Sequence, residues 1–166
     1  MAGSSSWASG ALPGSRSRSA SNLPDGTLVT ASGGRLALET SGNGHVIDVT
    51  DGVQRIVAAA GVDRGIVTVF AVGATVAVTT MEYEPGGVSD LQALLDRLIP
   101  AVGDYEHNRL NHDTNSHAHL RAAVIGPSET IPVLDGRPAL GTWQQIVLID
   151  FDDRPRHRTI NVQVLS

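Results

Sequence analysis

The fold is decided by residues 65–81, which read GIVTVFAVGATVAVTTM. Apolar and β-branched residues fill two runs in this stretch, Ile66–Phe70 and Val76–Thr80, and Gly73 separates them. Such a composition favours strands that are buried on at least one face. Because a glycine between two short strands is a turn signal, we predict a hairpin of two partly buried strands.

Further strands are predicted on both sides of this stretch. In Thr159–Leu165, apolar residues at positions 160, 162 and 164 alternate with polar ones, as in a half-buried strand. Trp143–Phe151 has an almost unbroken apolar centre, which indicates a central strand covered on both faces. The remaining predicted strands are Arg35–Thr40, Val46–Val49 and Ile131–Leu134.

Two main helices are predicted between these strands. The first runs from Thr50 to Gly61, where a glycine can close it in a left-handed cap. The second is predicted to start with a capping box formed by Ser89 and Gln92 and to stop before Pro100. A short apolar segment at positions 120–124, followed by Gly-Pro, is typical of one more short helix.

The predicted order β-β-α-β-β-α-β-β-β is not the alternation that builds a doubly wound parallel sheet. We therefore predict an α+β fold with largely antiparallel strands. The chain has 166 residues, the size of one domain, which we expect to cover residues 25–166. Residues 1–24 are poor in apolar side chains and read as a disordered extension, with a transit peptide as the alternative.

Composition excludes several classes of site and partner. The chain has no cysteine, which excludes disulfides, thiolate zinc sites and cysteine nucleophiles. Its net charge of −5 gives no general reason to expect a nucleic-acid partner. No apolar run approaches the roughly 18–20 residues that span a bilayer, so we expect no membrane partner and a cytoplasmic location.

Four of the six histidines lie close together, at positions 107, 112, 117 and 119. Imidazole is a common ligand of divalent transition metals, so this segment is a candidate metal site. His117 and His119 point the same way in an extended chain but lie about 200° apart around a helix. The alternative is a solvated polar connector, and His112 is the histidine that we expect to be an exposed loop residue.

Two further features carry charge. Glu82 follows the predicted strand Val76–Thr80 and is either a ligand or general base, or merely the point where that strand reaches water. Three arginines at positions 154, 156 and 158 follow a run of aspartates. Their planar guanidinium groups suit a phosphate, but the same pattern fits a hairpin turn in which neighbouring Asp and Arg side chains pair.

At these same residues the chain resembles the YjbQ-like family, named for a secondary thiamine-phosphate synthase activity. The elements Asn-x-His-x-His (115–119) and Gly-Thr-Trp-Gln (141–144) are the most specific parts of this likeness. The likeness spans Val46 to Val164. The other matching stretches are 75–86, 105–107, 113, 126–128, 131–133, 156 and 158.

The resemblance implies an α+β fold with two sheets that assembles as a homotrimer, with a site near the subunit boundary. It implies a transferase that joins a hydroxymethylpyrimidine diphosphate to a thiazole phosphate and releases pyrophosphate. Arginines and a divalent cation (Mg, Zn or another) would have obvious roles at the leaving group. Two alternatives remain open: a metal-dependent hydrolase of another small phosphorylated compound, and a non-enzymatic metal- or anion-binding trimer.

Carried over by position, the resemblance implies a site in three parts. His107, His117 and His119 form the metal set. The catalytic residues are His119, Glu82 and Asn115, and the substrate-binding residues are Trp143, Gln144, Arg156 and Arg158. One departure stands out, because many relatives have His-Thr-Thr where this chain has Gly73-Ala74-Thr75. If that histidine is a ligand elsewhere, His117 is a candidate to replace it here.

Overall fold

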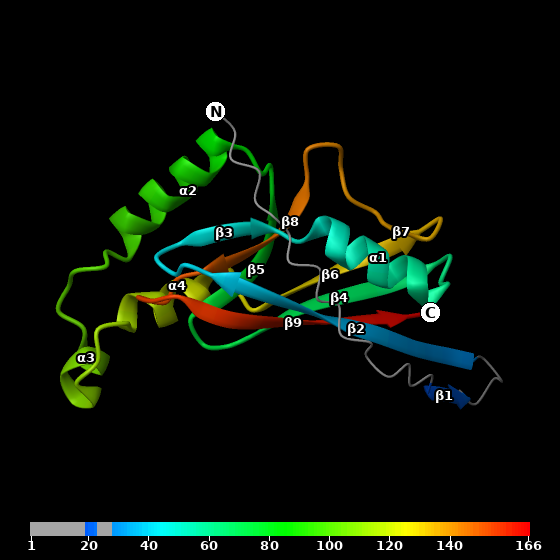
Figure 1. Ribbon diagram of the computed structural model, residues 1–166, viewed down its shortest axis with the longest axis horizontal. Coiled ribbons are helices and arrows are strands. Elements are labelled where there is room, and N and C mark those ends of the chain that lie inside the picture. Colours follow the sequence, from blue (N-terminus) through cyan, green and yellow to red (C-terminus); the bar gives the residue numbers. More distant parts are fainter. Residues whose placement is uncertain (1–18, 23–27) are drawn as a thin grey trace.

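The computed structural model describes residues 19–22 and 28–166, which form two antiparallel sheets and four helices (Figure 1). The six-stranded sheet has the order β1-β2-β9-β4-β6-β7, and the three-stranded sheet the order β3-β8-β5. The strands are β1 (Ser19–Asn22), β2 (Leu28–Thr40), β3 (His45–Asp48), β4 (Gly65–Val72), β5 (Val76–Met81), β6 (Ser128–Leu134), β7 (Arg137–Pro138), β8 (Gln145–Asp150) and β9 (Arg156–Leu165). The helices are α1 (Thr50–Ala60), α2 (Pro85–Leu98), α3 (Glu106–Asn111) and α4 (Ser116–Ile125).

The main core lies between the two sheets. Along β4 the side chains of Val67, Val69 and Ala71 are buried, while alternate residues of the strand face outward. The helix α1 packs on the same inner face of the large sheet through Val53 and Val57, both fully buried. Burying one such side chain stabilises the fold by roughly 1.5–3 kcal/mol, so this alternation fixes which face of the sheet is inside.

The three-stranded sheet is covered on both faces. Its central strand β8 is buried from Ile146 to Asp150, which confirms the prediction of a central strand in this region. The face opposite the main core packs against α2 and α4, with Phe151, Leu95 and Ala118 among the buried residues of this second core. The molecule is therefore layered, and α4 is held against β5 in the outer layer.

The hairpin predicted for residues 65–81 is wrong, although both of its strands exist. β4 pairs with β6 and β9 in the large sheet, whereas β5 pairs with β8 in the small one. Both strands are almost continuously apolar, so their sequences indicate burial but not their partners. The chain passes from one sheet to the other at Gly73, whose φ of 150° lies in a region that favours glycine.

The helix boundaries are confirmed in part. α1 begins at Thr50, and Gly61 adopts the predicted left-handed cap. The capping box at Ser89 is wrong, because α2 begins four residues earlier with Pro85 in its first turn. Glu84 caps this helix by accepting from the backbone N–H groups of residues 86 and 87, and proline is suited to a first turn that needs no N–H.

Two further features were only partly anticipated. α4 begins at Ser116, four residues before the apolar segment that predicted a short helix, so His117 and His119 lie inside this helix; α3 was not predicted. The extension predicted for residues 1–24 lies outside the described residues except for Ser19–Asn22, which pair with β2. Within the described part of the chain, no helix is long and apolar enough to cross a membrane.

Candidate functional site

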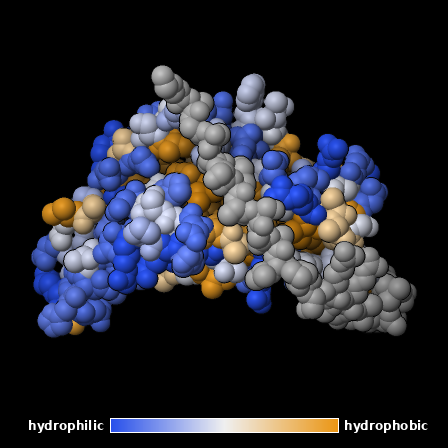
Figure 2. Space-filling model, viewed as in Figure 1, coloured by the Kyte–Doolittle hydropathy of each residue, from blue (hydrophilic) through white to orange (hydrophobic). Residues whose placement is uncertain are grey.

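The histidine segment forms two short helices that are tied to each other and to the sheet. α3 carries His107 and α4 carries His117 and His119. The side-chain oxygen of Asn108 accepts a hydrogen bond of 3.0 Å from the backbone N–H at the start of α4. The Thr114 hydroxyl donates to Asp153 Oδ2 at 2.6 Å, which links this segment to the turn between β8 and β9. The segment is therefore attached to the sheet on one side, and Figure 2 shows a mainly hydrophilic surface around α3.

His107 and His119 are in contact. Their ring centroids lie 4.9 Å apart and their planes meet at 62°, an edge-to-face arrangement. The contact joins α3 to α4 across the loop that contains the exposed His112. Of the predicted metal set, these two imidazoles are the ones that the fold brings together.

His119 is oriented by a backbone carbonyl. Its Nδ1 lies 3.1 Å from the carbonyl oxygen of Ala74, in the turn between β4 and β5. Because a carbonyl only accepts hydrogen bonds, Nδ1 of His119 carries the proton. The other ring nitrogen, Nε2, then has a free lone pair in the neutral imidazole, and this nitrogen can accept a proton or contact a substrate.

His107 has the opposite arrangement. The Asn111 side-chain nitrogen lies 3.2 Å from both the carbonyl oxygen and Nδ1 of His107. Since the carbonyl must accept, this amide nitrogen is the donor to both atoms, and a neutral His107 carries its proton on Nε2. That Nε2 is buried without a hydrogen-bond partner among the described residues. The Nε2–H group of His107, whose ring contacts His119, is thus free to donate a hydrogen bond to a ligand.

His117 faces a different environment. It is 7% exposed, and its Nδ1 has no hydrogen-bond partner in the described part of the chain. Burial lowers the pKa of His117, and the positive charge of Arg121 lowers it further. The two side chains of α4 diverge because they are two residues apart on a helix, about 200° around its axis. His117 is therefore a buried, neutral histidine that does not join the His107–His119 pair.

The predicted catalytic residue Asn115 lies at the start of α4. It occupies the position before the first helical residue, but its side chain caps no backbone N–H. Its Oδ1 is buried and has no partner among the described residues. Asn115 thus presents an unused acceptor on the same short segment as His119.

Arg158 is buried at the junction of the two sheets. Its Nε donates to Asp150 Oδ2 at 2.7 Å and its Nη2 to Asp150 Oδ1 at 2.6 Å, a two-pronged pair. Nη2 also reaches the Thr75 hydroxyl at 2.7 Å, and the Thr40 hydroxyl donates to Asp150. The hydrogen bonds to Asp150 raise the pKa of Arg158 above its usual range. The cluster joins β8 of the small sheet to β2 and β9 of the large one.

Asp152 and Arg156 extend this cluster towards water. Arg156 Nη2 donates to Asp152 Oδ1 at 3.1 Å, and its Nε lies 3.0 Å from Oδ2 of the same carboxylate without hydrogen-bonding geometry. Burial alone would raise the pKa of Asp152, but hydrogen bonds from Arg156 and Thr75 lower it to about 2. The two carboxylates, Asp150 and Asp152, balance the charges of the two guanidinium groups. This is the alternative from the sequence in which neighbouring Asp and Arg side chains pair. Of the two arginines in this cluster, Arg156, with a third of its side chain exposed, is the one that can reach a ligand.

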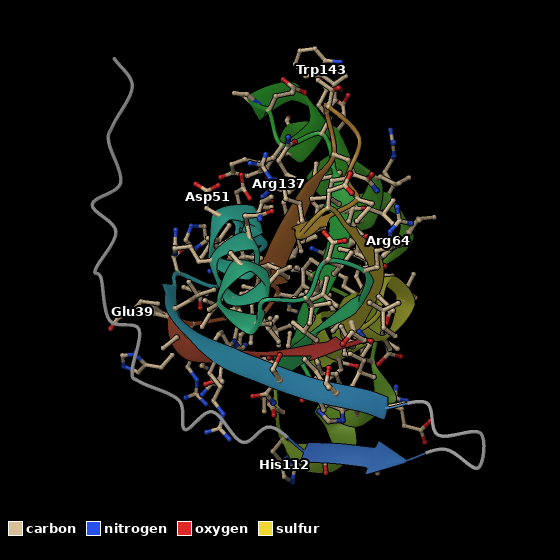
Figure 3. All side chains as sticks on the ribbon, turned by 90° about the vertical axis from the view of Figure 1, so that its right-hand side faces the viewer. Glu39, Asp51, Arg64, His112, Arg137 and Trp143 are labelled. Carbon is tan, nitrogen blue, oxygen red and sulfur yellow. The ribbon has the colours of Figure 1, made fainter. Side chains whose placement is uncertain are left out.

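The remaining predicted residues lie at the other end of the small sheet. Glu82 follows β5 and is exposed, and Gln144 donates to the Thr80 hydroxyl at 2.9 Å. Trp143 is 71% exposed on the loop before β8. The six residues of β5 separate these groups from Ala74 by about 20 Å. Figure 3 shows Trp143 and His112 at opposite ends of the molecule.

The donor set of one chain does not fit the predicted metal site. His117 diverges from the other two histidines, and Asn111 engages Nδ1 of His107. Across residues 19–22 and 28–166, no three His, Asp or Glu side chains gather in a group that could hold a metal ion. Two imidazoles alone are fewer than the three protein ligands typical of a catalytic zinc site.

Sequence reasoning missed the residues that support the site. Asp150 and Asp152 were noted only as neighbours of the arginines, and Thr75 and the Ala74 carbonyl had no assigned role. A signal existed for Asp150, because a carboxylate in an otherwise apolar strand needs a buried partner. A backbone carbonyl has no such signal, since its use depends on which helix the fold brings beside it.

Comparison with known proteins gives one consistent result. A family model described as UPF0047 protein YjbQ-like matches residues 34–166. A UPF0047 protein of Methanothermobacter thermautotrophicus is 38% identical over 129 residues, covering 78% of this chain and 88% of that protein. One of Mycobacterium tuberculosis H37Rv is 40% identical over 115 residues, covering 68% and 83%.

Solved structures agree with these sequence relatives. A crystal structure described as a YbjQ-like protein of unknown function, from Sulfolobus solfataricus, superposes with a TM-score of 0.79 at 30% identity. The match covers 83% of this chain and 99% of that one. A hypothetical protein from Aeropyrum pernix gives a TM-score of 0.76 at 35% identity, covering 81% and 98%. The expected α+β fold with two sheets is thereby confirmed, and the chain belongs to the YjbQ-like UPF0047 family.

Proposed function

We propose that the chain is a transferase that joins a hydroxymethylpyrimidine diphosphate to a thiazole phosphate and releases pyrophosphate. The observation that carries the proposal is the His107–His119 pair, in which Ala74 holds the proton of His119 on Nδ1 and leaves Nε2 for a substrate. An oriented imidazole is an effective proton donor or acceptor near neutral pH. The substrate class follows from the resemblance to the YjbQ-like family, which is named for a secondary thiamine-phosphate synthase activity.

His119 has the central role in this proposal. The thiazole nitrogen forms a bond to the methylene carbon of the pyrimidine, while the carbon–oxygen bond to the diphosphate breaks and its electrons leave with pyrophosphate. Nε2 of His119 first takes up a proton, while Nδ1–H stays bonded to Ala74, and then donates a hydrogen bond to the leaving oxygen, where negative charge develops. The unpartnered Nε2–H of His107 is a second donor, and Asn115 Oδ1 is an acceptor for the pyrimidine amino group.

The remaining predicted residues bind the substrates. Arg156 contacts a phosphate oxygen, whereas Arg158 is nine-tenths buried and holds the site together through Asp150. The indole of Trp143 stacks on a flat heterocycle, and Gln144 fixes the loop that carries it by bonding Thr80. Because both precursors are phosphorylated and charged, we expect the reaction to take place in the cytoplasm.

Copies of the chain complete one another in this proposal, as a homotrimer. Glu82, Trp143 and Gln144 lie about 20 Å from the histidine pair within one chain, so they act on the site of a neighbouring copy. The outward face of β4 supports assembly, because Ile66, Phe70 and Val72 are each about two-fifths to one-half exposed. Apolar side chains on one sheet face are typical of a protein–protein contact.

A divalent cation such as Mg or Zn stays a prediction. It would have to take donors from a neighbouring copy or from the substrate phosphates, since one chain offers two converging imidazoles. Metal analysis of the purified protein, together with its oligomeric state, tests this part directly. No step of the proposed reaction depends on the cation.

The activity is tested by complementation of a strain that lacks its main thiamine-phosphate synthase. The wild-type chain and His112→Gln are expected to restore growth without thiamine, and His119→Gln to fail at equal soluble expression. His112 is the matched control, because it lies on the same segment but is exposed and removed from the His107–His119 contact. Growth no better than empty vector with the wild-type chain would count against the transferase.

The two alternatives predict other outcomes. Release of phosphate from small phosphorylated compounds with added Mg, Mn or Zn, lost in His119→Gln, would favour a hydrolase at the same residues. If His119→Gln and Glu82→Gln change only thermal stability, and no substrate is turned over, the non-enzymatic binding trimer is favoured. Either outcome would contradict the proposed transferase activity.

A further inference from the structure

The turn at residues 73–75 lies between His119 and the buried Asp–Arg cluster. On one side, the Ala74 carbonyl accepts from His119 Nδ1. On the other, the Thr75 hydroxyl donates to Asp152 Oδ2 at 2.8 Å and accepts from Arg158 Nη2 at 2.7 Å. Two consecutive residues thus connect the histidine to a buried charge network.

We propose that Thr75 and Asp152 are positioning residues that fix the proton of His119 on Nδ1. The inference rests on the proposed function for its catalytic meaning, but the geometry that it describes is independent of any reaction. Their role is to hold the Ala74 carbonyl at the place where His119 must donate to it, and so to keep Nε2 facing a substrate.

Thr75 is suited to this role because it is anchored at three points. Its hydroxyl makes the two hydrogen bonds given above, and its own carbonyl accepts from the N–H of Phe151 at 2.9 Å. The residue is 5% exposed. The Ala74 carbonyl belongs to the same planar peptide unit as the Thr75 nitrogen and α-carbon. Fixing Thr75 therefore limits how far that carbonyl can rotate away from His119.

The residue before Ala74, Gly73, lies close to the same arginine. Gly73 has a φ of 150°, and a Cβ placed on it would lie 3.0 Å from Arg158 Nη1 and 3.0 Å from a methyl carbon of Val76. The backbone of the turn thus packs directly on the guanidinium group that also bonds Thr75. Arg158 and Asp152 therefore both support the turn, through their hydrogen bonds to Thr75 and the close approach of Arg158 to Gly73.

Loss of these anchors would alter the tautomer of His119. The proton of a neutral imidazole resides on the nitrogen whose hydrogen bond is stronger, so a displaced Ala74 carbonyl would let it move to Nε2. In that tautomer Nε2 could no longer accept a proton. A substitution at Thr75, which does not touch the ring, would then change the chemistry of the ring.

The experiment is NMR of protein with ¹⁵N-labelled histidine, above the pH at which the rings become neutral. Long-range ¹H–¹⁵N spectra distinguish the two tautomers, and His119→Gln assigns the signals of His119. The wild type is expected to have His119 protonated on Nδ1, and Thr75→Val to give a mixture with the Nε2 form. Thr79→Val is the matched control, since Thr79 lies in β5, the strand that directly follows Thr75, and makes no side-chain hydrogen bond within the described residues.

Two further variants keep the test decisive. Thr75→Ser retains the hydroxyl and should restore the Nδ1 tautomer, whereas Asp152→Asn should weaken it, so the inference is testable even if Thr75→Val does not fold. A His119 that stays fully protonated on Nδ1 in folded Thr75→Val or Asp152→Asn would overturn the inference. Because the spectra require no turnover, this failure is distinct from a failure of the transferase assay.

Discussion

Arg158 places a positive charge at the junction between the two sheets. The stability of the fold depends on this charge. Asp150, the partner of Arg158, is fully buried, so removing the guanidinium leaves a carboxylate without its counter-charge. We expect Arg158→Met to lower the free energy of unfolding by about 3–5 kcal/mol. Urea denaturation measures this. The matched control is Arg154→Met, an exposed arginine of the same turn, which should change stability by no more than about 0.5 kcal/mol. Similar stabilities for the two variants would contradict the assigned role.

His117 predicts a dependence of stability on pH. Burial and Arg121 lower its pKa in the folded chain, so the unfolded chain binds the proton more tightly. The neutral ring therefore contributes stability that is fully present above its ordinary pKa of about 6.5 and is lost as the pH falls below that value. Unfolding free energies measured between pH 7 and pH 5 should decline less steeply in His117→Gln. Identical slopes in the variant and the wild type would show that His117 is not buried as described.

At the scale of single residues, sequence patterns identify which groups matter but not which groups meet. The histidine segment and the arginines were found because four histidines and three arginines are each concentrated in a short stretch of the chain. The separation of His117 from His119 needed the knowledge that both lie inside α4, and the helix start was misplaced by only a few residues. The use of the Ala74 carbonyl could not be foreseen, because it depends on a helix about 45 residues away in the chain.

At the scale of elements, local signals identify strands and helices well and their neighbours poorly. β4 and β5 were both predicted, yet they belong to different sheets because the partner of an apolar strand is set by distant residues. The start of α2 was misplaced because Ser89 and Gln92 have the spacing of a capping box. In the folded chain Gln92 reaches the carbonyl of Gly44 instead, a long-range contact that no local pattern contains.

Whether Glu84 or Ser89 caps α2 can be tested directly. Glu84 accepts hydrogen bonds from two N–H groups at the helix start, and its negative charge suits the positive end of the helix dipole. We expect Glu84→Ala to lower the free energy of unfolding by about 1 kcal/mol. Ser89→Ala lies within the same helix and should change it by less than about 0.5 kcal/mol. The reverse order, measured by urea denaturation, would support the capping box.

At the scale of the whole molecule, the predicted site residues separate into two groups at opposite ends of β5. This separation is expected if a site forms between copies, and it yields a prediction from mixed oligomers. His119→Gln and Glu82→Gln chains carrying different tags are co-expressed, and trimers that hold both chains are purified. Each variant alone should be inactive, but a mixed trimer has one boundary with both groups intact, so about one site in three should recover. Mixed trimers as inactive as the pure variants would mean that Glu82 does not act across a boundary.

The proposed reaction depends on His119 as the residue that performs chemistry. Its most direct test is pyrophosphate release by purified protein supplied with hydroxymethylpyrimidine diphosphate and thiazole phosphate. The wild type and His112→Gln should release pyrophosphate at the same rate, and His119→Gln should lose activity at least about a hundredfold, as expected for a removed proton donor. Equal rates for wild type and His119→Gln would rule out a chemical role for His119.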